Sequence, residues 1–121
     1  MTDTYHDICA EAELANGQSM AQLLNGWPIL VTRSEDRVYA VINRCTHAEA
    51  QLQEGRIRRS MVSCPLHGAR FELATGKCVG APYLPLKTFP ARIADGRIEV
   101  AVPDAAPGKE HQPVRSDATP D

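Results

Sequence analysis

Two short segments carry the residues whose types and spacing could do redox chemistry. The first is Cys45-Thr46-His47, and the second is Cys64-Pro65-Leu66-His67-Gly68. Each segment offers one thiolate and one imidazole. Two loops with the same pair of donors suit a [2Fe–2S] centre in which cysteines hold one iron and histidines hold the other. The sequence therefore predicts one such cluster per chain, bound by Cys45, His47, Cys64 and His67.

The formal charge of this centre explains why a protein would use such a ligand set. Two ferric ions, two sulfides and two thiolates sum to zero when both imidazoles are neutral, whereas four thiolates would leave a dianion. Because an electron enters a neutral centre more easily, the histidine-ligated cluster has a reduction potential of roughly −150 to +300 mV, against about −400 mV for a plant-type cluster with four cysteines. This ligand set favours single-electron transfer.

A mononuclear zinc site is the rival interpretation of the same four side chains. Two cysteines and two histidines can bind zinc tetrahedrally. Zinc fingers usually pair Cys with Cys and His with His along the chain, whereas each segment here pairs Cys with His. The order of the donors therefore favours the cluster. Cys9 and Cys78 have no histidine two or three residues away, so we expect them to be structural or free thiols.

Length and composition indicate one ordinary globular domain. The chain has 121 residues, of which 23% are charged and 43% hydrophobic, with a formal net charge of −2. This charge gives no reason to expect nucleic acid or an anionic membrane as a partner. There is no run of about 18 apolar residues that would predict a transmembrane helix. The N-terminus is polar and acidic, unlike a secretory signal, so we expect a cytoplasmic protein whose cysteines bind metal.

Short strands joined by turns are expected to position the two segments. Ser34-Glu35-Asp36 and Asp95-Gly96 are turn signals between apolar runs, and the Asp-Gly pair is typical of a hairpin. A strand end followed by one helical turn is expected within residues 8–14. The pattern predicts strands over residues 28–33, 37–42, 70–73, 88–93 and 97–102, whereas residues 57–63 are mixed and end like a strand. Many short strands at regular spacing favour an all-β sandwich or a partly open barrel.

Composition divides the chain into a domain and a tail. Residues 1–102 are expected to form the cluster domain, and residues 103–121, which lack periodicity, are expected to be a flexible C-terminal tail. Trp27 is expected in the core, and residues 83–86 are expected to pack against the cluster domain. The basic group Arg56, Arg58 and Arg59 is interpreted as a solvated face in preference to a docking site.

The two ligand segments resemble those of the Rieske family. The chain looks most like the small ferredoxins that serve bacterial aromatic-ring-hydroxylating dioxygenases. The similar stretches are Cys45-Thr46-His47-Ala48 with Leu52 and Gly55 after it, residues 64–71, Ala74-Thr75-Gly76-Lys77, and Ala81-Pro82 as a third loop that could shield the cluster. The resemblance covers roughly residues 5–102.

This resemblance implies a fold, a ligand assignment and a role. The fold is all-β, with three small antiparallel sheets and two cluster-binding loops at one tip. Cys45 and Cys64 are implied as ligands of the inner iron, and His47 and His67 as ligands of the outer iron through Nδ1. The implied role is a monomeric electron carrier, not itself an enzyme, in a multicomponent dioxygenase of aromatic hydrocarbon catabolism. Its partners would be a flavin-dependent NAD(P)H reductase and a terminal Rieske oxygenase, both bound by transient docking.

Two other functions stay open at this point. The chain could be the small Rieske subunit of another oxidoreductase, such as a nitrite reductase, or a structural zinc domain or redox sensor. One departure from the family bears on the potential. High-potential relatives place Ser after the Gly of the second loop and Tyr two residues later, where this chain has Ala69 and Phe71. Fewer hydrogen bonds to sulfur stabilise the reduced state less, so a potential toward the low end of the Rieske range is expected.

Overall fold

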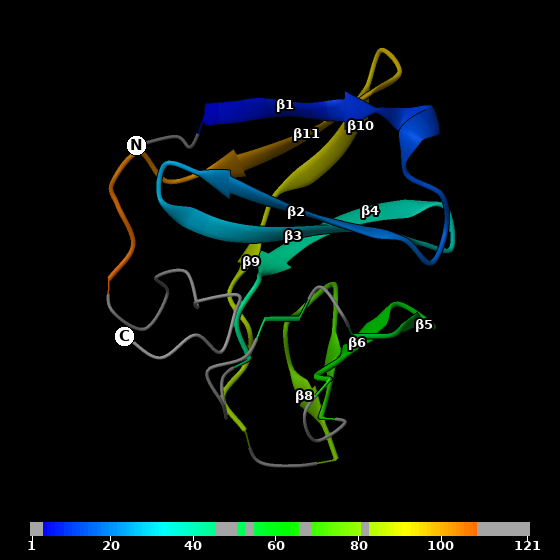
Figure 1. The fold of residues 1–121 in the computed structure, drawn as a ribbon, viewed down its shortest axis with the longest axis vertical. Coiled ribbons are helices and arrows are strands. Elements are labelled where there is room, and N and C mark those ends of the chain that lie inside the picture. The colour runs from blue at the N-terminus through cyan, green and yellow to red at the C-terminus, as the bar shows by residue number, and fades with distance from the viewer. Residues whose placement is uncertain (1–3, 46–50, 53–54, 66–68, 81–82, 109–121) are drawn as a thin grey trace, which may run out of the picture.

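The computed structural model describes residues 4–45, 51–52, 55–65, 69–80 and 83–108. These residues form three antiparallel sheets, which confirms the all-β prediction and the implied three-sheet arrangement (Figure 1). The helical element within them is a single short turn, η1 (Glu11–Glu13), after the first strand, as expected. None of the helices described is long and apolar enough to cross a membrane.

The first sheet joins the beginning of the chain to the last strands. Its order is β1-β11-β10, and its strands are β1 (Thr4–Ala10), β10 (Ala91–Ala94) and β11 (Arg97–Val102). Asp95 and Gly96 connect β10 to β11 with φ of 51° and 75°. This left-handed conformation at both central positions is the one that a tight hairpin requires, and it confirms the Asp-Gly signal.

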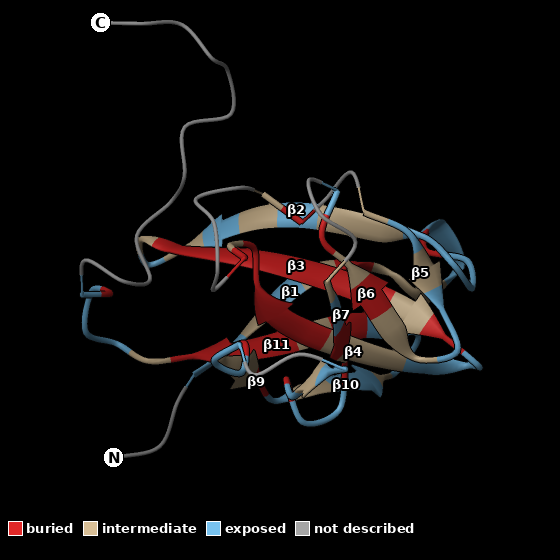
Figure 2. Ribbon diagram, turned by 90° about the horizontal axis from the view of Figure 1, so that it is seen from below, coloured by how far each residue is buried: buried red, intermediate tan, exposed pale blue. Residues whose placement is uncertain are grey.

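The second sheet supplies most of the core. Its order is β2-β3-β4-β9, and its strands are β2 (Ser19–Leu24), β3 (Trp27–Ser34), β4 (Arg37–Ile42) and β9 (Thr88–Phe89). β3 is buried along almost its whole length (Figure 2). β2 was not among the predicted strands, because Ser-Met-Ala-Gln-Leu-Leu has no β-branched residue; pairing with β3 makes it a strand.

The third sheet carries the second ligand segment. Its strands, in order, are β5 (Ile57–Arg58), β6 (Met61–Ser63), β7 (Arg70–Glu72) and β8 (Cys78–Val79). Residues 57–63 were expected to end like a strand, and β6 confirms this. Arg59 and Ser60, with φ of 51° and 59°, form the hairpin turn between β5 and β6.

The hairpin tip between β5 and β6 holds the third sheet against the second. The backbone N–H of Ser60 donates to Oγ of Ser34 at 3.0 Å, and the Ser60 hydroxyl donates to Oε1 of Glu35 at 3.2 Å. Ser34 and Glu35 lie at the β3–β4 turn. The two turns therefore fix the orientation of the small sheet relative to the core sheet.

Trp27 anchors the segment that follows β11. It is buried, as predicted, and its ring meets Phe89 edge-on at 5.6 Å between centroids. Its indole N–H donates to the carbonyl oxygen of Ala105 at 2.9 Å, and Pro107 nearby is buried. Residues 103–108 thus pack on the domain, whereas residues 109–121 lie outside the described chain. The proposed flexibility of the tail stays a prediction.

Candidate metal centre

The two predicted cysteine ligands lie in loops that leave buried strands. Cys45 follows β4, and Cys64 follows β6 directly. Their exposed fractions are 2% and 1%. All four cysteines of the chain are within the described residues, and they are thiols rather than disulfides. The structure therefore keeps both thiols buried and chemically available to a metal.

Apolar side chains surround the two thiols. Cys45 and Cys64 belong to the hydrophobic core together with Leu52, Phe71 and Leu73, which are at most 1% exposed. Such packing excludes water from the thiol side of the site. Burial and hydrogen bonding to sulfur are the features by which a protein adjusts the potential of an iron–sulfur centre.

The second ligand loop connects β6 to β7. Ser63 and Arg70 face each other in the register of these two strands, at the base of the loop. The backbone N–H of Cys64 donates to the carbonyl oxygen of Ala69 at 2.7 Å. The loop is therefore closed by a short bond between its first and last residues. His67, the predicted imidazole ligand of this loop, lies outside the described residues.

Asn43 braces the first ligand loop. Its backbone N–H donates to the carbonyl of Pro28 at 2.8 Å, and its Oδ1 accepts the backbone N–H of Leu52 at 2.7 Å. Asn43 is only 4% exposed. The Asn43 side chain thus links residues 43 and 52, on either side of the segment that contains Cys45. His47, in the same segment, lies outside the described residues. Sequence reasoning missed Asn43, although a lone amide after the apolar end of β4 was the available signal.

The two ligand loops come together at Gly55. A Cβ atom on this residue would lie 1.8 Å from the carbonyl oxygen of Ser63 and 3.0 Å from that of Leu52. The backbone N–H of Ser63 also donates to the carbonyl of Arg56 at 3.0 Å. The end of the first loop therefore lies in backbone contact with the residue that precedes Cys64, as two segments that bind one cluster require.

The third loop is described only in part. Ala81 and Pro82 lie outside the described residues. Leu86 is buried and its backbone N–H donates to the carbonyl of Gly76 at 2.8 Å, which confirms its expected packing. Tyr83, Leu84 and Pro85 are exposed, Leu84 by 73%, so the expectation that residues 83–86 would pack against the domain was wrong for these three. Gly76 has φ of 81°, a left-handed conformation that glycine adopts at low cost.

The described residues fit half of a cluster site. Two buried thiols in apolar surroundings are the soft donors that iron–sulfur centres use. Within the described part of the chain, no three or more His, Cys, Asp or Glu side chains gather as metal ligands, and both predicted histidines are outside it. The complete set of four ligands stays a prediction.

Burial raises the pKa of the Cys9 thiol, which keeps this β1 residue neutral.

The fold defines the class as a small β protein of three antiparallel sheets, with one buried cysteine in each of two loops that meet at Gly55. Comparison with known families gives the class a name. Residues 4–90 match the model of the Rieske [2Fe-2S] domain, and the chain belongs to this family. Its cofactor is accordingly a Rieske-type [2Fe–2S] cluster.

The chain aligns with nearly the whole length of related proteins of known sequence or structure. The chain is 34% identical over 99 residues to the anthranilate 1,2-dioxygenase ferredoxin subunit of Burkholderia cepacia, covering 81% of this chain and 92% of that protein. The ferredoxin of carbazole 1,9a-dioxygenase from Nocardioides aromaticivorans IC177 superposes with a TM-score of 0.76 at 34% identity, covering 81% and 97% of the two chains.

Two further solved structures share the fold. A Mycobacterium tuberculosis protein assigned as the small subunit of an NADH-dependent nitrite reductase gives a TM-score of 0.77 at 29% identity, covering 83% of this chain and 96% of that one. A ferredoxin solved in complex with the reduced oxygenase of carbazole 1,9a-dioxygenase gives 0.76 at 28% identity, with coverage of 87% and 97%.

Proposed function

We propose that this protein is an electron-transfer ferredoxin. It accepts single electrons from a flavin-dependent NAD(P)H reductase and passes them to the terminal Rieske oxygenase of an aromatic-ring dioxygenase. The observation that carries this proposal is the 34% identity to the anthranilate dioxygenase ferredoxin, which extends over 92% of that protein. The related ferredoxin bound to its oxygenase supports the same kind of partner.

In this proposal the cluster is held by Cys45, His47, Cys64 and His67. When bound, it supplies a one-electron couple of moderate potential. The chain buries both thiolates, braces the first loop through Asn43, and closes the second through the Cys64–Ala69 hydrogen bond. The protein has no substrate of its own. It acts as a monomer in the cytoplasm, where NAD(P)H is available, and docks transiently through a modest surface.

A nitrite-reductase subunit is the alternative role, and the fold by itself does not separate the two. The TM-scores of 0.77 and 0.76 for the two kinds of relative are practically equal. Sequence favours the ferredoxin role, because the chain is 34% identical to the anthranilate dioxygenase ferredoxin subunit and 31% identical to the naphthalene dioxygenase ferredoxin component of Pseudomonas aeruginosa.

Spectroscopy followed by reconstitution tests the proposed role. The purified protein should be coloured, contain iron, and give a Rieske-type EPR signal after reduction with dithionite. Added to the reductase and terminal oxygenase of an anthranilate 1,2-dioxygenase system, it should make product formation depend on both NADH and itself. A folded, colourless and iron-free protein would contradict the cluster. Stable co-purification with a larger nitrite reductase chain would favour the alternative.

The histidine ligands are tested by His67→Cys. A third thiolate adds negative charge to the centre, so any cluster that forms should have a much lower potential, moving toward about −400 mV. Its EPR g-values should change as well. Protein-film voltammetry and EPR measure both effects, with His6→Cys on β1 as a control that keeps the wild-type signal. Wild-type spectra in the His67 variant would remove His67 from the ligand set.

The potential should also respond to Ala69→Ser. Ala69 is half-buried at the end of the second loop, and its carbonyl accepts from Cys64. A hydroxyl donor to the cluster sulfurs would stabilise the reduced state by on the order of 1 kcal/mol, or about 40 mV for one electron. Voltammetry should show this rise in Ala69→Ser but not in Ala74→Ser, whose site is exposed. An unchanged or lower potential for Ala69→Ser would count against the account.

A further inference from the structure

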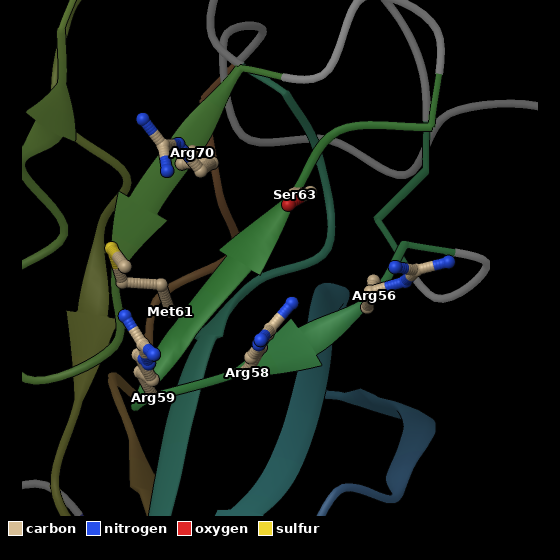
Figure 3. Close-up of a pocket in the computed structure, with 6 residues that line it drawn as sticks. All are labelled: Arg56, Arg58, Arg59, Met61, Ser63 and Arg70. Atoms are coloured by element: carbon tan, nitrogen blue, oxygen red, sulfur yellow. The ribbon is translucent and has the colours of Figure 1, made fainter.

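Four arginines gather on the outer face of the third sheet. In the strand register Arg58 lies opposite Met61 and Arg70 lies opposite Ser63, while the carbonyl of Arg56 accepts the N–H of Ser63. Side chains alternate across a sheet, and the intervening positions of β6 and β7 are buried. The exposed residues Arg56, Arg58, Arg59 and Arg70 are here called the basic face (Figure 3).

The basic face differs from other arginines of the protein in how its charge is compensated. Three arginines outside the third sheet each pair with a carboxylate: Arg33 with Glu11 at 3.3 Å, Arg92 with Glu99 at 2.7 Å, and Arg97 with Asp7 at 2.7 Å. Within the part of the chain that the structure describes, no carboxylate pairs with an arginine of the basic face. Within the described residues, the third sheet therefore carries four arginines that no carboxylate pairs with.

Among the described residues, two carboxylates near the basic face accept hydrogen bonds from hydroxyl groups. Glu72 on β7 accepts a hydrogen bond from the Thr75 hydroxyl at 2.7 Å. Glu35, near the Arg59 end, accepts from the Ser60 hydroxyl. A hydroxyl donor is neutral, so both carboxylates keep their charge, but within the described residues the four guanidinium groups of the basic face outnumber them.

The surface is hollowed and partly apolar. The four arginines, Met61 and Ser63 line a hollow of about 340 Å³, with guanidinium groups around its edge (Figure 3). Val79, which lies opposite Arg70 on β8, adds an apolar side chain that is 36% exposed. Arginine and methionine are enriched at protein interfaces, and a guanidinium can bind a carboxylate through two parallel hydrogen bonds. These features fit an acidic protein surface.

The basic face also lies next to the second ligand loop. Ser63 and Arg70 are the strand residues at its base, one residue before Cys64 and one residue after Ala69. A partner that contacts Arg56 and Arg70 therefore approaches the part of the molecule that carries the predicted ligands. A partner that docks there would lie close to the cluster, and a short distance to the cluster makes electron transfer faster.

We infer that the basic face is a docking site for an acidic surface on a protein redox partner. The redox nature of the partner rests on the proposed function. The sequence analysis interpreted Arg56, Arg58 and Arg59 as a solvated face. The strand register adds Arg70 to them and places the group beside the ligand loop, which favours docking. Binding of nucleic acid is the competing use of such a surface, and a DNA duplex therefore serves as a second probe.

The test compares two double variants with the same change in charge. Arg56→Gln/Arg70→Gln removes two charges from the basic face, and Arg92→Gln/Arg97→Gln removes two from the first sheet. The probe is flavodoxin, a small acidic flavoprotein. Its affinity for the cluster-containing protein is measured by calorimetry with both proteins oxidised, so that no electron moves. Stopped-flow absorption then follows the transfer of one electron from reduced flavodoxin to the oxidised cluster.

Affinity and transfer rate should both depend on the basic face and on salt. For the wild type, both should fall steeply as NaCl rises from about 20 to about 300 mM, because salt screens steering between charged surfaces. Arg56→Gln/Arg70→Gln should lower both about tenfold at low salt and hardly at all at high salt. The first-sheet variant should stay within about twofold of the wild type. Absorption spectra and melting temperatures check that every variant keeps its cluster and its fold.

Several outcomes would overturn the docking inference. One is a wild-type protein that shows no salt dependence, and another is equal affinity for all three proteins. Binding of a short DNA duplex at about 150 mM salt, lost in Arg56→Gln/Arg70→Gln, would reassign the face to nucleic acid. A different outcome would contradict the proposed function alone. If flavodoxin binds through the arginines but no dioxygenase turnover is supported, the carrier role is wrong and the docking surface still stands.

Discussion

Cys64→Ala should abolish the cluster. The thiol that it removes is 1% exposed and lies at the start of a loop closed by the Cys64–Ala69 hydrogen bond, so no water or neighbouring donor can easily replace it. Metal binding contributes directly to folding free energy when the site forms only in the folded state. We expect bound iron to fall at least about tenfold and the free energy of unfolding to fall by about 3 kcal/mol or more.

Iron analysis, visible absorption, EPR and thermal unfolding measure these effects. Cys78→Ala is the matched control, because Cys78 is a half-buried thiol of the same sheet, on β8 opposite Phe71. It should keep the full iron content and lose only on the order of 1 kcal/mol through packing. A Cys64→Ala protein with wild-type iron content and spectra would eliminate Cys64 as a ligand and with it the proposed centre.

Gly55→Ala should have the second-largest effect, although it changes no ligand. The new Cβ would lie 1.8 Å from the backbone oxygen of Ser63, a separation that no real pair of these atoms tolerates. Relief requires moving β6, and Cys64 follows Ser63 directly. The two ligand loops must then separate. We expect a loss of about 3 kcal/mol or more in stability, together with incomplete cluster occupancy.

Gly17→Ala separates this steric effect from the general cost of replacing a glycine. Gly17 has φ of 86° and no neighbour within 4 Å of an added Cβ. Only the strain of the left-handed conformation applies there, about 1 to 2 kcal/mol, and iron content should be normal. If Gly55→Ala matches the wild type in melting temperature and in iron content, the described approach of the two loops is wrong.

The arginine variants of the basic face test partner docking, whereas the Cys64 and Gly55 variants test cluster assembly and stability. Cys64 and Gly55 concern the assembly of the centre, whereas Arg56 and Arg70 are exposed and line the hollow of the basic face. Loss of docking with an unchanged EPR signal would therefore separate partner recognition from cluster binding within a single small sheet.

Local chemistry explains what could be predicted from the sequence by itself. The two Cys-His segments indicated the metal and its use in electron transfer through donor type and order alone. The Asp95-Gly96 hairpin and the Gly76 turn were predictable because glycine and aspartate adopt left-handed backbone conformations at low cost. Each of these features depends on residues that are close together in the chain.

Tertiary structure decided the features that depend on partners far away in the sequence. Ser19–Leu24 became a strand only through its pairing with β3, and Asn43 acquired its role by reaching Leu52. The register of β6 with β7 placed Arg70 across Ser63 from Arg56, and backbone contact at Ser63 explains why residue 55 is glycine. Residue types near one another in sequence fix turns and donor sets, whereas strand register and backbone contacts arise only when the whole chain packs.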